Sequence, residues 1–149
     1  MAIGKGEDEL RQLAVEVQVL EQTAATLQER MHMVNAIITD LSISSLALEG
    51  IGKEKEGSEI LVPIGASSYV RAKLGLIDKV IVGVGAGVSV EKSVDEAKEI
   101  VKQRLEELQK TRVSIQQQFS QVAERINSDR QRFDELAAEL RQGKPQPNV

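Results

Sequence analysis

Three glycines, Gly83, Gly85 and Gly87, follow a run of Val and Ile residues and resemble a ligand-binding loop. Glycines placed after a strand can let backbone amides surround a phosphate, so a nucleotide site is the first chemistry to test. The dinucleotide fingerprint requires another glycine five residues after the first, with a helix beginning inside the motif. Val88 and Val90 occupy the two positions where that glycine is needed, and a strand-like pattern follows. The spacing therefore argues against nucleotide binding.

Side chains that carry catalysis or hold metals are scarce. The chain has no cysteine and one histidine, His32, which falls within a helical pattern away from its apolar positions. A lone histidine supplies neither a metal-ligand set nor a nucleophile–base pair. We therefore expect no catalytic residue, no metal site and no cofactor, and a protein that is not an enzyme.

Composition limits the partners. Aromatic residues make up 2% of the 149 residues, and the net charge is −4. Nucleic acid is an improbable partner because no basic face with interleaved aromatic residues is present. The first ten residues lack the apolar core of a secretory signal, and no apolar stretch approaches the roughly 20 residues that span a bilayer. We expect no membrane contact and a cytoplasmic location.

Two long heptad patterns flank the glycine motif. Apolar residues recur at alternating spacings of three and four from Leu10 to Leu48 and again from Val101 to Leu140. This spacing is typical of a coiled-coil seam, and the polar Asp129 interrupts the second pattern at a cost in stability. The patterns predict two helices of similar length that pair in antiparallel fashion.

The boundaries of these helices follow from capping and breaking residues. Gly50 and Gly52 are expected to end the first helix, and Ser93 with Glu96 forms the pattern of a capping box for the second. Gly143 and the prolines after it end the second helix. The expected segments are a helix over 7–49, a hairpin segment over 50–92, a helix over 93–142 and a disordered tail over 143–149.

Four short strand patterns fill the segment 50–92. Pro63 predicts an edge or a bulge in the first of them, and "GASS" is a turn signal before the alternating "YVRAKL". A second pair, "KVIVGV" and "VSVEK", flanks Gly85-Ala86-Gly87, which suits a short hairpin loop. The segment therefore predicts two successive β-hairpins between the helices.

The glycine-bearing hairpin has one apolar face and one nearly bare face. Because strand glycines contribute no packing of their own, another backbone is expected to come close to the bare face. Exposed strands also invite pairing with a second chain, so we expect an obligate oligomer in which the strands close into a shared sheet or barrel. The expected oligomer interface consists of Leu61, Val62, Tyr69, Val70, Val80, Val82, Gly83, Val84, Gly85, Val88 and Val90.

Two stretches, "LVPIGASSYVRAKL" (61–74) and "VIVGVGAGVSVEKSVDEAKEI" (80–100), closely resemble the core of the alpha subunits of the prefoldin family. The helix–two hairpins–helix layout is similar over nearly the whole chain. The second hairpin indicates the alpha class, since beta subunits of this family carry one hairpin. The expected fold is α+β: a long antiparallel coiled coil with two inserted hairpins that form a shared β-barrel platform in the oligomer.

The resemblance implies an ATP-independent molecular chaperone. Prefoldins assemble as hexamers of two alpha and four beta subunits, with alpha–alpha contacts through the hairpins. Their coiled-coil tips hold unfolded polypeptides and deliver them to a group II chaperonin. Two alternatives remain open: a filament-forming relative that polymerises through its hairpins, and a coiled-coil scaffold that binds no unfolded protein.

The free tip of the coiled coil is the expected site of capture. Both chain ends should lie there, and terminal turns fray because they lack neighbours on one side. Fraying would expose seam residues, and several tips acting on one polypeptide would add weak contacts into useful avidity. The candidate residues for binding unfolded protein are Ile3, Leu10, Leu13, Val17, Phe133, Leu136 and Leu140.

Overall fold

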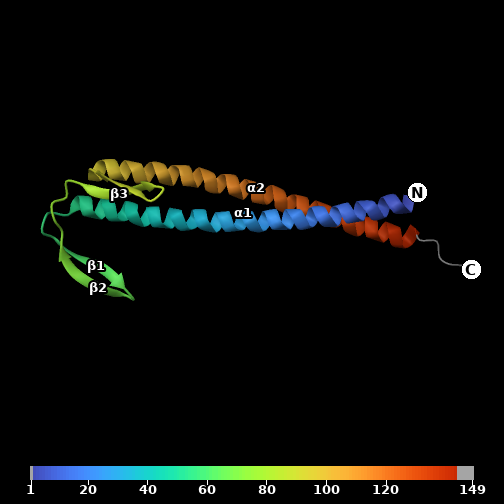
Figure 1. Ribbon diagram of the computed structural model, residues 1–149, viewed down its shortest axis with the longest axis horizontal. Helices are drawn as coiled ribbons and strands as arrows, with labels where there is room; N and C mark the ends of the chain where they lie inside the picture. The colour runs from blue at the N-terminus through green and yellow to red at the C-terminus, as the bar shows by residue number, and fades with distance from the viewer. Residues whose placement is uncertain (1, 144–149) are drawn as a thin grey trace, which may run out of the picture. The chain divides into compact units, whose positions relative to one another are not determined.

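The computed structural model describes residues 2–143, with side chains from Gly4 onward. In chain order, two hairpins lie between two long helices (Figure 1). The elements in order are α1 (Ala2–Lys53), β1 (Glu59–Gly65), β2 (Ser68–Lys73), β3 (Val80–Gly85), β4 (Val88–Lys92) and α2 (Val94–Gly143). The expected α+β arrangement of two long helices and two antiparallel hairpins is confirmed. The tail after Gly143, and the side chain of Ile3, lie outside the described residues.

The chain divides into two units. The end unit comprises Met1–Val34 and Thr111–Val149, and the hairpin unit comprises Asn35–Lys110. Each helix contributes to both units. The end unit contains the two chain termini, and the hairpin unit contains all four strands.

The helices of the end unit pair in antiparallel fashion because apolar seam residues meet between them. The buried members include Leu27 from α1 and Ile115, Ile126 and Leu136 from α2. Close contact persists at the termini, where a Cβ built on Gly6 would lie 2.9 Å from Leu140 Cδ2. Burial of the seam is the main stabilising contribution in a helix pair of this kind.

Three ion pairs connect the helices of the end unit. Arg125 Nη2 lies 2.8 Å from Glu16 Oε1, and Arg132 Nε lies 3.1 Å from Glu9 Oε1. Arg130 pairs with Glu21. All six side chains are about half exposed, so each pair contributes little to stability but favours one orientation of the two helices.

Both hairpins close through two-residue turns. Ala66 and Ser67 in the first hairpin have φ of 47° and 58°, and Ala86 and Gly87 in the second have φ of 52° and 74°. Positive φ at both central residues is the requirement of a type I′ turn, which matches the twist of the adjoining strands. The pairing shifts between Pro63 and Gly65, and again between Gly83 and Gly85. The irregularity predicted from Pro63 is therefore present in β1.

The second hairpin packs on the helices of its own unit. Val82 joins a buried cluster with Leu41 and Leu48 of α1 and Ala97 and Val101 of α2. Val80 packs against the edge of this cluster, so the valine-bearing side of β3 forms part of the core. The first hairpin differs, because every residue of β1 and β2 is exposed except the half-buried Ile60 and Ala72.

α2 begins at Val94, directly after the expected cap Ser93, and α1 (Ala2–Lys53) extends beyond the expected 7–49 at both ends. Ser93 Oγ accepts a hydrogen bond from the Glu96 amide at 3.1 Å, as the capping pattern predicts. The first helix does not end at Gly50 but continues through Gly52 to Lys53. At Gly52 a Cβ would lie 3.6 Å from Val94 Cγ1, so this last turn packs against the beginning of α2. Tertiary packing there outweighs the low helix propensity of glycine.

Candidate functional sites

The residues predicted to bind unfolded polypeptide lie together at the paired helices of the end unit. Leu10, Leu13 and Val17 of α1 are half-buried, as are Phe133 and Leu140 of α2. Leu136 is buried in the seam. Half-burial leaves part of each apolar side chain in contact with solvent while the seam holds the rest.

A hollow of about 330 Å³ opens among these residues. Its apolar lining comes from Ala14, Val17 and Phe133, and Arg130 and Asp134 add charged groups. Sequence analysis identified Val17 and Phe133 as seam residues but missed the other three. Each of the three directly follows a seam residue in the sequence. Residues at such flanking positions line the edge of the seam, and this position is the feature that could have identified them.

Asp129 is the one buried charged side chain among the described residues. Its Oδ1 lies 3.2 Å from Arg125 Nε, and its Oδ2 is buried without a hydrogen-bond partner. Burial raises the pKa of Asp129, and the attraction of Arg125 opposes part of this rise. The predicted polar interruption of the seam therefore lies inside the helix pair.

The predicted oligomer interface divides into two groups in the structure. Val82 is 8% exposed and Val80 is half-buried, because β3 lies on the helices of its own unit, and Val90 of β4 is half-buried as well. These three valines differ from the expectation, since most of their surface is already covered. The exposed members are Leu61, Val62, Tyr69, Val70, Gly83, Val84, Gly85 and Val88.

Exposed apolar residues that sequence analysis did not single out extend this surface. Ile81 is 74% exposed on the same side of β3 as Gly83, where a Cβ built on the glycine would meet nothing within 4 Å. Ile64 and Leu76 are also exposed in the hairpin unit. Strand alternation could have identified Ile81, because its parity is that of the glycines.

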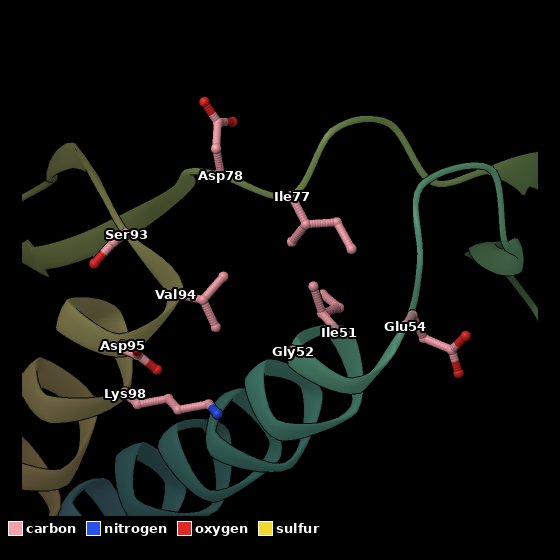
Figure 2. A pocket seen from close by; sticks show the side chains of 9 residues that line it. All are labelled: Ile51, Gly52, Glu54, Ile77, Asp78, Ser93, Val94, Asp95 and Lys98. Carbon is pink, nitrogen blue, oxygen red and sulfur yellow. The ribbon is translucent and has the colours of Figure 1, made fainter.

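A second hollow, also of about 330 Å³, lies where α1 ends and α2 begins (Figure 2). Ile51, Ile77 and Val94 turn toward one another across it, whereas Asp78 and Glu54 point away. Lys98 extends toward Gly52, and a Cβ at that glycine would lie 3.3 Å from its Nζ. Asp95 and Lys98, both from α2, lie beside one another at this hollow.

The described residues contain no group of three or more His, Cys, Asp or Glu side chains able to hold a metal ion. His32 is exposed on α1. The described part of the chain therefore presents apolar surface rather than a chemical centre as its candidate functional feature.

The expectation about apolar stretches needs a correction. Within Gly4–Lys53 an 18-residue window reaches a mean hydropathy of 1.3, which is apolar enough to cross a membrane by length and composition. Hydroxyls contribute little polarity there, since Thr39, Ser42 and Ser44 each donate to a carbonyl of their own helix. One such helix is weak support for a membrane span, since core helices of soluble proteins meet the same criteria.

The apolar side chains of α1 exceed those needed for its seam with α2. Within the hairpin unit Ile43 and Leu46 are exposed, the latter by 70%. Val15 and Val19 are exposed in the end unit. Unpaired apolar surface of this kind, together with the exposed hairpin strands, is typical of a subunit that assembles with other chains.

The fold thus defines a class of subunits in which two long antiparallel helices are joined by two β-hairpins. The family model for "Prefoldin subunit" matches residues 4–139, and the chain belongs to the prefoldin family. Prefoldin subunit alpha of Methanococcoides burtonii is 34% identical over 82% of this chain and 88% of its own length. The corresponding subunit of Pyrococcus horikoshii is 33% identical over 86% of this chain and 87% of its own.

These relatives agree with the two-hairpin layout in placing the chain among the alpha subunits. The structure is also similar to that of filamentous PFD from Methanocaldococcus jannaschii, with a TM-score of 0.64 and 26% identity. The match covers 76% of this chain and 93% of that one. Family membership makes the chain a prefoldin chaperone subunit that assembles with other subunits.

Proposed function

We propose that this chain captures unfolded polypeptides with the end unit, without ATP, as the alpha subunit of a cytoplasmic prefoldin. The observation that carries the proposal is the hollow between Val17 and Phe133, open to solvent beside half-buried seam leucines. An unfolded chain offers scattered apolar side chains, which such a surface can hold by non-directional burial. Several copies of this surface in one assembly would add their weak contacts.

The exposed hairpin residues form the assembly surface in this proposal. The open side of β3, with Ile81 and Gly83, accepts the backbone of a neighbouring subunit. The expected assembly is a hexamer with two alpha and four beta subunits, in which the alpha subunits touch through their hairpins. A group II chaperonin receives the captured polypeptide. Nucleic acid, membranes and enzymatic turnover have no part in this function.

The experiment is an ATP-free aggregation assay on the complex assembled with a beta subunit. Guanidinium-denatured, reduced lysozyme is diluted into the assay, and light scattering reports its aggregation. Replacing Leu10, Leu13 and Phe133 together by Ser should reduce suppression severalfold while the mass of the complex is unchanged. Val113→Ser is the control, because this valine is exposed in the end unit but is neither a lining residue of the hollow nor one of the predicted capture residues.

An unchanged suppression by the triple variant would refute capture at the end unit. Failure of the wild-type complex to suppress aggregation would instead favour the scaffold alternative. Delivery is tested separately by adding a group II chaperonin with ATP and measuring recovery of native lysozyme in the presence of an oxidised–reduced glutathione buffer.

A filament-forming assembly is the second candidate, and the similarity to filamentous PFD favours it. The exposed strands of both hairpins would then join successive copies of this chain in a heterologous contact that does not close. Mass measurement on the chain with and without a beta subunit distinguishes the two. A ladder of increasing masses supports the filament, and a discrete complex that forms only with a beta subunit supports the hexamer.

A further inference from the structure

Asp129 occupies a seam position at which most coiled coils place an apolar residue. It is 4% exposed, and Ile126 and Phe133 lie one turn away on either side along the seam face of α2. Oδ2 has no hydrogen-bond partner in the protein. An ionised carboxylate with one unpaired buried oxygen is costly, because the lost hydration is not replaced.

The pairing of Asp129 is shared with another carboxylate. The charged groups that face it are Arg125 on its own helix and Glu16 on α1. Arg125 Nε lies 3.2 Å from Asp129 Oδ1, while the same group donates to Glu16 Oε1 at 2.9 Å. One guanidinium therefore serves two carboxylates, so the cluster has a net negative charge, and Asp129 is its buried member while Arg125 and Glu16 remain partly exposed.

A solvent-open hollow lies beside the seam next to Asp129, on the side of the chain termini. Val17 adjoins Glu16 on α1, Phe133 is one turn beyond Asp129 on α2, and the two line the 330 Å³ hollow. Space beside a seam layer removes the close contacts that hold it shut. A buried charge and an adjoining hollow therefore lie between the terminal turns and the buried seam residues Ile126 and Leu27.

We propose that Asp129 is a break point in the helix pair. Residues 4–16 of α1 and 130–143 of α2 open together beyond it, while 20–34 and 111–125 remain paired. Opening exposes Leu136, which the closed pair buries, together with the rest of Phe133 and Leu140. The inference rests on the proposed capture function, and it adds how much apolar surface is offered and what controls it.

The break point responds to protonation. Burial and the nearby Glu16 raise the pKa of Asp129, and Arg125 lowers it by a smaller amount. The pKa of Asp129 is higher in the closed pair than its ordinary value. Below that ordinary pKa, protonated Asp129 favours closure fully. This contribution is lost as the pH rises through the higher pKa of the closed pair. Near neutral pH the ionised form therefore favours the open pair, and acidification favours closure.

Amide hydrogen exchange on the assembled complex tests this proposal. Asp129→Leu should slow exchange of 4–16 and 130–143 roughly tenfold, because an apolar residue replaces a poorly compensated buried charge. Residues 20–34 and 111–125 should be unchanged. Glu124→Leu is the matched control, an exposed carboxylate on the same helix whose replacement should leave both regions unchanged.

Asp129→Asn tests the charge while preserving the shape. In the wild type, exchange of 130–143 should speed up between pH 4 and pH 7 beyond the intrinsic chemical rate, and the Asn variant should lose this excess. A general structural role predicts slower exchange along the whole helix pair in Asp129→Leu, without a boundary at 129. That result, or unchanged exchange of the terminal segments, would overturn the break point.

The aggregation assay separates this inference from the proposed function. If the opened end captures unfolded protein, Asp129→Leu, which keeps the end closed, should reduce suppression of lysozyme aggregation severalfold at pH 7. Slower terminal exchange with full suppression would support the break point and refute capture by the opened end. Unchanged exchange would refute the break point whatever the suppression.

Discussion

Arg104 of α2 donates a hydrogen bond from Nη1 to the carbonyl oxygen of Gly83 in β3, at 3.1 Å. The contact fastens the backbone of the second hairpin to the helix that follows it. Together with Val82 in the core of the hairpin unit, it fixes one side of the hairpin and leaves the other open.

Loss of this hydrogen bond should loosen the second hairpin. Arg104→Met keeps an apolar stem and removes the donor, and we expect a cost of about 1 kcal/mol in local stability. Amide exchange of β3 and β4 should become several times faster, while the first hairpin is unaffected. Lys102→Met, at an exposed position two residues earlier, is the control and should leave exchange in β3 unchanged.

Val82 and Val84, two valines of β3 that sequence alternation groups together, should respond differently to truncation. Val82→Ala removes buried methyl groups from the core and should destabilise the chain by about 1–3 kcal/mol. Val84 is 42% exposed, so Val84→Ala should cost less in the isolated chain. Thermal denaturation followed by circular dichroism measures both, and equal losses would contradict the assignment of Val82 to the core.

A side chain added to the bare side of β3 should block assembly before it harms the fold. A Cβ added at Gly83 meets nothing within 4 Å in the chain, and the position needs no positive φ, so the helical content should be retained in Gly83→Val. The mass of the assembly with a beta subunit should fall. A stable, full-size complex of Gly83→Val would refute close approach of a partner backbone.

Gly85→Val is the less informative variant, although sequence alone makes the two glycines look equivalent. Gly85 has a φ of +109°, which an L-amino acid with a branched side chain rarely adopts. This substitution should therefore disturb the turn of the hairpin even in the isolated chain. Amide hydrogen exchange of β3 and β4 in the isolated chain should therefore be faster in Gly85→Val than in Gly83→Val.

The ion pairs of the end unit should determine helix orientation more than stability. Arg132→Glu places two carboxylates together near Glu9 and should lower the melting temperature slightly, whereas adding Glu9→Arg should restore it. The difference in melting temperature between the wild type and Arg132→Glu should shrink in 1 M salt, because these side chains are half exposed. A loss that salt does not reduce would indicate lost packing instead.

The sequence by itself determines the elements of this protein. A seam that alternates three and four residues specifies paired helices whatever their surroundings, because only that spacing keeps apolar side chains on one face. The glycines of Gly85-Ala86-Gly87 and the strand patterns beside them likewise indicate a tight hairpin, because glycine accepts the positive φ that such a turn requires. The resemblance in 61–74 and 80–100 is sufficient to indicate the family.

The tertiary structure decides how each face is used. Alternation groups Val82 with Val84, but only packing on α1 and α2 buries the first and leaves the second exposed. Gly52 favours a helix end locally, yet contact with Val94 allows α1 to continue. Asp129 is visible in the sequence as a polar interruption, but its unpaired oxygen and its competition with Glu16 for Arg125 arise only when the second helix is in place. Periodicity is a property of one element, whereas burial and charge pairing depend on the neighbour that covers it.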